Sequence, residues 1–186
     1  DSLSGKILRL NPDASIPADN PFPNSTVFAL GFRNVQGLAF GPNNLLYATE
    51  FGPNKDHEIN LVLPGKNYGW PEVTGKSGNN KFEDPLIVRQ PSEASWSGLT
   101  YFQDGAIPAW KDQLFAAALS GQRLWRLTLS EDGKTITSQE ALFIRNFGRL
   151  RLITQAPDGS LWLVTNNRDG RGNPREGDDH IYRIGP

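Results

Sequence analysis

A three-part pattern recurs along this chain and constrains its fold more than any other feature. Each copy is a short apolar segment, a turn and a second apolar segment, followed by a third segment that alternates apolar and polar residues. The copies begin at Gly37, Gly98 and Leu152, so the unit returns roughly every 50 to 60 residues, and no amphipathic helix pattern exceeds about two turns. Repeated small antiparallel sheets of this kind are typical of a β-propeller. The sequence therefore predicts an all-β fold.

The pattern predicts one partial propeller domain over residues 1–186 with about three blades. We expect an orphan strand at 5–10 and blades at approximately 27–65, 97–130 and 150–186. Complete propellers have about 4 to 8 blades, because only a closed ring covers every blade face. The chain has no Met, even at its first position, which suggests a processed product or a piece of a longer protein. We expect missing sequence or another chain, including a second copy, to complete the ring.

Composition excludes several classes of function. The chain has 19 basic and 20 acidic residues and a net charge of -1, so it has no overall positive field to attract nucleic acid or an anionic membrane. It has no Cys, which excludes disulfides, thiol catalysis and thiolate metal sites. No apolar run approaches the roughly 20 residues that span a bilayer.

Two polar clusters lie just before inner strands of the predicted blades. Arg33, Asn34 and Gln36 precede the first, and Arg149 and Arg151 take the equivalent place before the third. Residues two apart on a strand point to one face, and paired guanidiniums suit a ligand that carries carboxylates. We expect the five side chains to converge on one site at the mouth of the channel. The alternative is that they are exposed residues that pair loosely with acids.

The turn after the first blade's second strand offers oxygen atoms. Asp56, Glu58 and the main-chain carbonyls of Gly52 and Pro53 are ligands of the type that calcium prefers. The alternative is a loop whose carboxylates are simply solvated.

The five tryptophans are more consistent with blade cores than with ligand platforms, because large aromatic side chains are usually buried. Trp96 is the best candidate for an exception. The five are Trp70, Trp96, Trp110, Trp125 and Trp162.

Several runs together resemble the soluble PQQ-dependent sugar dehydrogenases, that is, the glucose/sorbosone dehydrogenase family of the aldose sugar dehydrogenase type. The resemblance begins with the sequence GFRNVQGLA at 31–39. It continues in the same order through TEFGP at 49–53, GKNYGWP at 65–71, DGAIPAW at 104–110 and GRLR at 148–151. It covers nearly the whole chain.

The resemblance implies a six-bladed propeller, of which this chain resembles the C-terminal half. It implies that PQQ lies across the channel mouth with a calcium ion (Ca2+) held partly by the main-chain oxygens of Gly52 and Pro53. Glu58 and Tyr68 match positions that hold a second, structural calcium. The residues that it implies for cofactor contact are Arg33, Asn34 and Gln36 on the quinone side and Arg149 and Arg151 at the carboxylates.

The activity that the resemblance implies is oxidation of an aldose sugar at its C1 hydroxyl to the lactone, with calcium polarising the quinone carbonyl that accepts hydride. The family's catalytic base is a His of the N-terminal half, so no catalytic residue is expected in this chain. We therefore expect the chain to be inactive alone and to need the missing half or a second copy. The family also implies a periplasmic or secreted location.

Four positions depart from the family pattern. Phe32 stands where the family usually has His, Phe51 where it has a polar residue, His57 where it has an acid and Ser120 where many members have a basic residue. The rival from another class, consistent with Phe32, Phe51 and Ser120, is a non-catalytic propeller that binds sugar or protein at the channel mouth. A calcium-dependent lactonase is disfavoured, because no acidic set of channel ligands is apparent.

Overall fold

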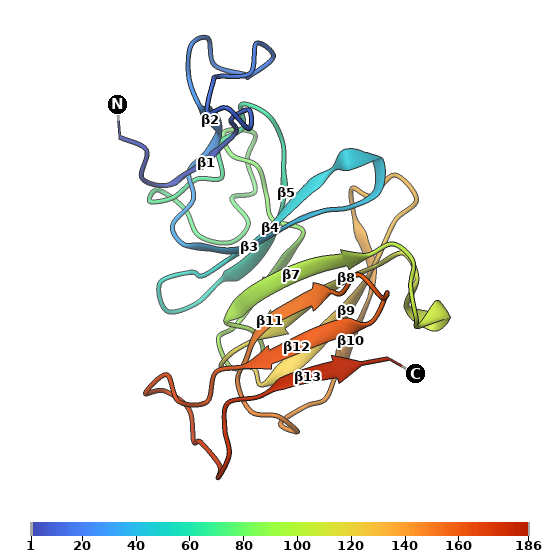
Figure 1. Cartoon of the computed structure of the whole chain (residues 1–186). Coiled ribbons are helices and arrows are strands. Elements are labelled where there is room, and N and C mark those ends of the chain that lie inside the picture. The colour runs from blue at the N-terminus through green and yellow to red at the C-terminus, as the bar shows by residue number, and fades with distance from the viewer. Residues whose placement is uncertain (1, 186) are drawn as a thin grey trace.

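The computed structural model describes residues 2–185 and consists almost entirely of strands and loops (Figure 1). Two single-turn 3-10 helices, Pro42–Asn44 and Pro108–Trp110, interrupt the loops. The strands form four antiparallel sheets that follow one another from the blue N-terminal end to the red C-terminal end (Figure 1). The predicted all-β class is confirmed.

The N-terminal sheet has two strands, β1 (Lys6–Leu8) and β2 (Val27–Leu30). The next sheet has four strands in the order of the chain. They are β3 (Val35–Phe40), β4 (Leu46–Glu50), β5 (His57–Val62) and β6 (Ile87–Arg89).

The third sheet again has four strands in sequence order, and the last sheet has three. The third contains β7 (Trp96–Phe102), β8 (Gln113–Ala118), β9 (Arg123–Leu129) and β10 (Ile136–Leu142). The last contains β11 (Leu150–Gln155), β12 (Leu161–Thr165) and β13 (Ile181–Ile184). Below we call these three larger sheets the first, second and third blade.

The sheet boundaries differ from the expected ones in two places. The strand expected to be an orphan pairs with Val27–Leu30, with Ile7 opposite Ala29, so the first blade starts at β3 rather than at residue 27. Each of the first two blades also extends beyond its expected end, through β6 and β10. Both additions are outer strands: β6 has three residues, and most of β10 is exposed. Neither carries the apolar alternation that predicts a half-buried strand.

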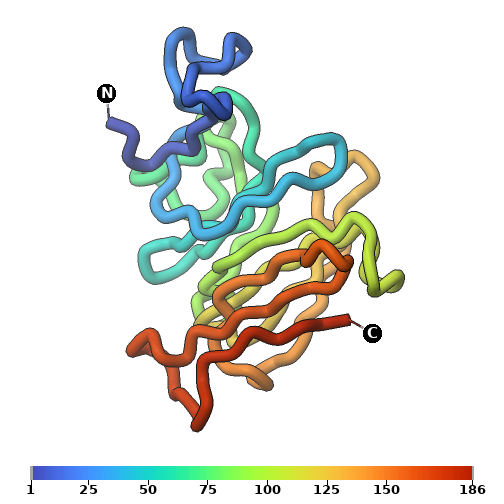
Figure 2. Tube along the Cα trace, viewed as in Figure 1, coloured from blue at the N-terminus to red at the C-terminus, as the bar shows by residue number. Residues whose placement is uncertain are grey.

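The inner strands β3, β7 and β11 lie next to one another (Figures 1 and 2). Side chains join the three blades here: Thr49 Oγ1 on β4 donates to the Ser97 carbonyl at 2.6 Å, and Ser97 Oγ donates to the Leu150 carbonyl at 2.8 Å. The backbones approach closely enough that a Cβ on Gly98 would lie 2.8 Å from Leu152 Cα. Glycine is required here by space, because its backbone does not have a positive φ.

Replacing Gly98 by Ala should destabilise the chain by about 1–3 kcal/mol, because the added methyl group meets backbone that cannot move without separating β7 from β11. The measurement is the free energy of unfolding from urea titration of each variant. Ser138→Ala on the exposed strand β10 is the control and should change stability by less than about 0.5 kcal/mol. A Gly98→Ala protein as stable as the wild type would contradict the close packing of these strands.

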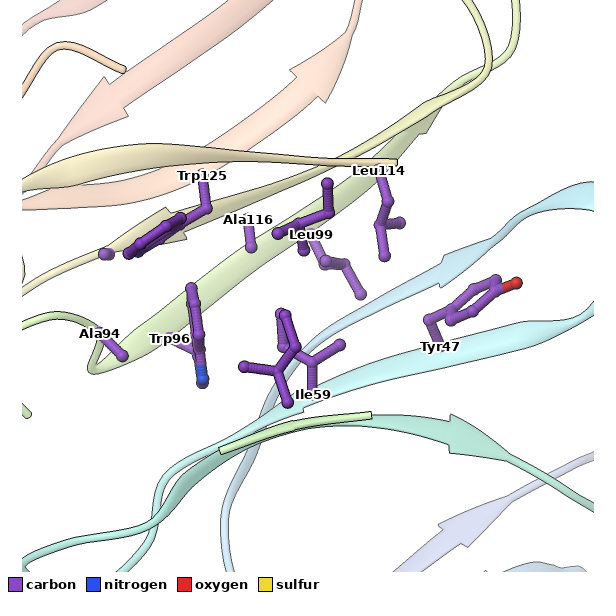
Figure 3. Close-up of a cluster of buried hydrophobic side chains, with 11 residues drawn as sticks. Tyr47, Ile59, Ala94, Trp96, Leu99, Leu114, Ala116 and Trp125 are labelled. Atoms are coloured by element: carbon purple, nitrogen blue, oxygen red, sulfur yellow. The ribbon is translucent and has the colours of Figure 1, made fainter. Parts of the chain in front are cut away.

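Two apolar cores lie between successive blades. The core between the first and second blades contains Tyr47 and Ile59 on one side and Trp96, Leu114 and Trp125 on the other (Figure 3). A second core joins the second and third blades and includes the buried residues Phe102, Phe115, Leu124, Ile153, Leu161 and Leu163. Each blade is therefore stabilised mainly by the face of its neighbour.

Candidate functional site

A cavity of about 720 Å³ opens among loops at one end of the three blades. We call it the mouth cavity. Its wall comes from the residues before β3, the turn after β4, the end of β8, the start of β11 and the loop 166–180. Among the residues that line it are Arg33, Asn34, Phe51, Gly52, Pro53, His57, Ser120, Arg149, Arg151, Asp169 and Arg171.

The cavity brings together most of the predicted site. Arg33 and Asn34 are far from Arg149 and Arg151 in the chain, yet all four line the same space. Gln36 joins them through hydrogen bonds: its Nε2 donates to Asn34 Oδ1 at 2.7 Å, and its Oε1 accepts from Arg151 Nη1 at 3.2 Å. The bond to Arg151 connects the first blade to the third.

Arg33 is held over the turn that follows β4. Its Nη1 donates to the carbonyls of Phe51 and Gly52, each at 3.2 Å, and its guanidinium lies 5.5 Å from the centre of the Trp70 ring. The backbone N–H groups of Arg33 and Asn34 both donate to the Glu50 carboxylate. The main-chain oxygens of this turn thus already contact a positive charge.

The charge of the cavity is strongly positive. Four arginines and one aspartate line it, and Asp169 forms an ion pair with Arg149 at 2.7 Å. Within residues 2–185, Arg33, Arg151 and Arg171 form no ion pair with a carboxylate. Arg151 instead contacts neutral amides: with its oxygen turned toward Arg151, Asn166 accepts from Nε at 3.2 Å and from Nη2 at 3.0 Å. Guanidiniums without a counter-charge attract an anionic ligand.

Glu58 and Tyr68 lie outside the mouth cavity. They line a second cavity of about 10 Å³, together with Glu50 and Gly52, and this space holds about one water-sized particle. Glu50 and Glu58 face each other across β4 and β5. Burial, together with a smaller effect of the neighbouring Glu58, raises the pKa of Glu50 to about 7. Burial also raises the pKa of Glu58. Two buried carboxylates beside so small a space favour a cation or a proton.

The oxygen atoms around this second cavity are not equally free. Glu58 accepts from the Gly75 N–H at 2.6 Å and from Asn60 Nδ2 at 3.2 Å. The Tyr68 hydroxyl donates to the Leu61 carbonyl and accepts from the Leu63 N–H. Asn60 is buried, and its Oδ1 has no partner within the described chain. No group of three or more His, Cys, Asp or Glu that could hold a metal occurs in residues 2–185, so any metal ligand set here would also need amide, hydroxyl or main-chain oxygens.

Residues 1–182 match the model of a known family, described as glucose/sorbosone dehydrogenase. The chain belongs to this family. The suspected resemblance is therefore confirmed, and it spans nearly all of the chain.

Relatives of known name support the same assignment. The chain is 31% identical over 189 residues to the aldose sugar dehydrogenase YliI of Escherichia coli, a match that covers 91% of this chain and 50% of that protein. A segment of 74 residues is 60% identical to quinoprotein glucose dehydrogenase B of Acinetobacter calcoaceticus, covering 38% of this chain and 16% of that protein.

The structure of the PQQ-bound form of an aldose sugar dehydrogenase from Streptomyces coelicolor matches with a TM-score of 0.88 and 42% identity, over 99% of this chain and 52% of that one. The propeller fold expected from the sequence is confirmed by this likeness. The chain spans about half the length of the YliI protein and of this solved structure.

The four positions that depart from the family pattern divide between two environments. Phe32 is buried and stacks on Tyr68 at 4.5 Å between ring centres, so it belongs to the core. Phe51 and Ser120 line the mouth cavity, as does His57. Burial lowers the pKa of His57, and its ring meets Phe51 edge to face at 5.3 Å.

The tryptophans also lie in different environments, among them the blade core and the neighbourhood of the site. Trp96 was the best candidate for a ligand platform, and this expectation is wrong: its side chain is 0% exposed in the core between the first two blades. Trp125 is buried beside it. Trp70 is the tryptophan that approaches the site, through Arg33.

Sequence reasoning missed three residues of the site: Glu50, Trp70 and Asp169. Glu50 reads as the last residue of a strand, and Asp169 lies in a Gly-rich loop with no periodic pattern. Glu50 hydrogen-bonds to a residue about 17 positions away and Asp169 to one about 20 positions away, and such distant pairings have no local sequence signature.

Within the described residues, no helix has the length and apolar character needed to cross a membrane.

Proposed function

We propose that this chain forms part of a PQQ- and calcium-dependent sugar dehydrogenase that oxidises an aldose at its C1 hydroxyl to the lactone. The observation that carries the proposal is the mouth cavity, where three of the four arginines have no carboxylate partner within the described residues. The names of the relatives support sugar oxidation and PQQ as the cofactor. The donor set fits PQQ, a planar quinone with several carboxylates, because forked guanidinium donors bind carboxylates in pairs.

In this proposal Arg149 and Arg151 bind the carboxylates of the cofactor, and Arg33 and Asn34 contact its quinone side. Gln36 orients Asn34 and Arg151 through its two hydrogen bonds. Trp70 holds the Arg33 guanidinium in place from one side. When bound with calcium, PQQ supplies the electrophilic carbonyl that accepts hydride from the sugar.

The main-chain oxygens of Gly52 and Pro53 are the proposed ligands of the calcium at the cofactor. The Gly52 carbonyl oxygen accepts from Arg33 Nη1 and keeps a second lone pair for such a role. Glu58 and Tyr68 remain the proposed ligands of a second, structural calcium. The unpartnered Asn60 Oδ1 and the paired carboxylates of Glu50 and Glu58 favour a cation there.

The proposal includes a partner that completes the ring. The third blade has three strands where the other two have four. Its outer face exposes Leu152, Trp162 and Ile181, the last at 69%, and such apolar sheet faces are normally covered. The N-terminal half of the same enzyme is the proposed partner, and a second copy of this chain is the alternative. The proposed catalytic base lies in that partner, and the family's periplasmic or secreted location is proposed with it.

The test is a titration with PQQ and Ca²⁺ of the chain alone and of the chain combined with an N-terminal half from a relative, followed by absorbance of the bound quinone. We expect binding and aldose oxidation by the combined protein and no oxidation by the chain alone. A combined ring that binds no PQQ would contradict the proposal. If that ring still binds sugar, it would favour the non-catalytic binding module. Light scattering of the chain alone tests self-association.

A further inference from the structure

Arg149 is the most enclosed cation of the mouth cavity, and Asp169 is its partner. Asp169 Oδ2 accepts from Arg149 Nε at 3.0 Å and from Nη2 at 2.7 Å. The two side chains are only 7% and 15% exposed. The other carboxylate oxygen, Oδ1, accepts from the Arg171 N–H at 2.9 Å. Asp169 therefore uses both oxygens, one to hold the arginine and one to anchor itself in its own loop.

The loop that carries Asp169 is fitted closely around Arg149. Asn167 Oδ1 accepts from the Arg149 N–H at 2.7 Å, and the Asn166 N–H donates to the Arg149 carbonyl at 2.9 Å. At Gly172 a Cβ would lie 2.9 Å from Arg149 Cδ and 2.4 Å from the Asn167 carbonyl oxygen. The loop thus fixes both the backbone and the side-chain stem of this arginine.

These contacts leave one edge of the guanidinium for a ligand. Arg149 Nε and Nη2 donate hydrogen bonds to Asp169, whereas Nη1 has only a long contact of 3.4 Å to Ser120 Oγ. Both Arg149 and Ser120 line the mouth cavity. Of the five N–H donors of a guanidinium, those on Nη1 are therefore the least occupied.

We infer that Asp169 is a positioning residue: it fixes the Arg149 guanidinium so that its Nη1 edge binds a carboxylate of an anionic ligand in the mouth cavity. The inference rests on the function proposed above, because it concerns the same cavity. It assigns to the loop 166–172 the role of building the anion site. Asp169 is not expected to touch substrate or cofactor itself.

A competing view is that Asp169 is only a counter-charge. In that case removing its charge would leave four unopposed arginines, and anion binding would tighten. Positioning predicts the opposite sign. The amide of an Asp169→Asn variant would have a single oxygen where the Asp169 carboxylate uses two, and its N–H groups would face the donors of Arg149 or Arg171. The Asp169→Asn variant therefore separates the two views.

The experiment measures binding of citrate by calorimetry and of PQQ by absorbance to the wild-type chain and to Asp169→Asn and Asp169→Glu. We expect Asp169→Asn to bind citrate about tenfold more weakly, since a hydrogen bond to a charged group is lost. Asp169→Glu should recover part of this loss. Asp158→Asn, which removes a carboxylate from the exposed ion pair with Arg183 on the same blade, is the matched control and should bind like the wild type.

A second readout follows the arginine directly. The Arg149 Nε–H resonance in nitrogen-15 NMR should exchange slowly with solvent in the wild type and rapidly in Asp169→Asn. Equal or tighter citrate binding by Asp169→Asn, an unchanged Nε–H resonance, or no citrate binding by the wild type would each overturn the inference. If the citrate affinities of the wild type and the variants follow the expected order but PQQ does not bind even to the combined ring, the proposed function fails and the positioning role of Asp169 stands.

Discussion

Replacing Arg151 by Met should weaken PQQ binding on the order of a hundredfold, because two charge-assisted hydrogen bonds to a carboxylate are lost. Arg151 is the mouth-cavity arginine whose contacts are all to neutral amides, Gln36 and Asn166. No ion pair with a carboxylate within the described residues occupies its charge, which is therefore available to an anionic ligand. Quinone absorbance in a titration with PQQ and Ca²⁺ on the combined ring gives the dissociation constant.

Two variants separate the geometry of Arg151 from its charge. Arg151→Lys keeps the charge without the forked donors, so its affinity should fall between those of the wild type and Arg151→Met. Arg126→Met is the matched control: Arg126 pairs with Glu140 across β9 and β10, and its removal changes the net charge by the same amount. Arg151→Met with an affinity within about threefold of Arg126→Met would show that the ligand does not use this arginine.

The arginine pair shows how far the sequence alone defines the site. The spacing of Arg149 and Arg151 predicts that both side chains face one direction, and both line the mouth cavity. The spacing does not predict that they differ in environment. Arg149 is buried against Asp169, whereas Arg151 meets only amides. That difference depends on how the loop 166–180 folds back over β11, and a loop without periodicity gives no signal for its path.

The strands could be predicted where one face is buried. β4, β7 and β8 carry apolar runs that pack into the cores, and the sequence locates each of them. Outer strands such as β10 have little buried surface, so their residues show no alternation. The pairing of β1 with β2 was also missed, because 18 residues of loop separate the strands and local patterns do not reveal such partners.

Trp96 is a core residue whose burial the sequence did not single out. Its neighbours in the chain, Ser95 and Ser97, are polar, yet all three residues are buried. Ser97 is buried because its hydroxyl joins β8 and β11 through two carbonyls. Ser97 therefore reflects close packing of strands rather than contact with solvent.

Replacing Trp96 by Ala should lower the free energy of unfolding by about 3–5 kcal/mol, which is the usual effect of removing a large buried aromatic side chain. Trp96 is 0% exposed and meets Trp125 edge to face at 6.1 Å (Figure 3), so the cavity left behind would lie between two blades. The measurement is urea unfolding of the chain, followed by circular dichroism.

Trp96→Phe should be much milder, because its ring refills most of the space. The wild-type indole N–H is buried without a partner within residues 2–185, and phenylalanine also removes that unsatisfied donor. Trp162→Ala, at a position that is 45% exposed on the third blade, controls for loss of a tryptophan outside the core and should change stability by less than about 1 kcal/mol. If Trp96→Ala were no more destabilising than Trp162→Ala, the blade–blade core would not be what holds the first two sheets together.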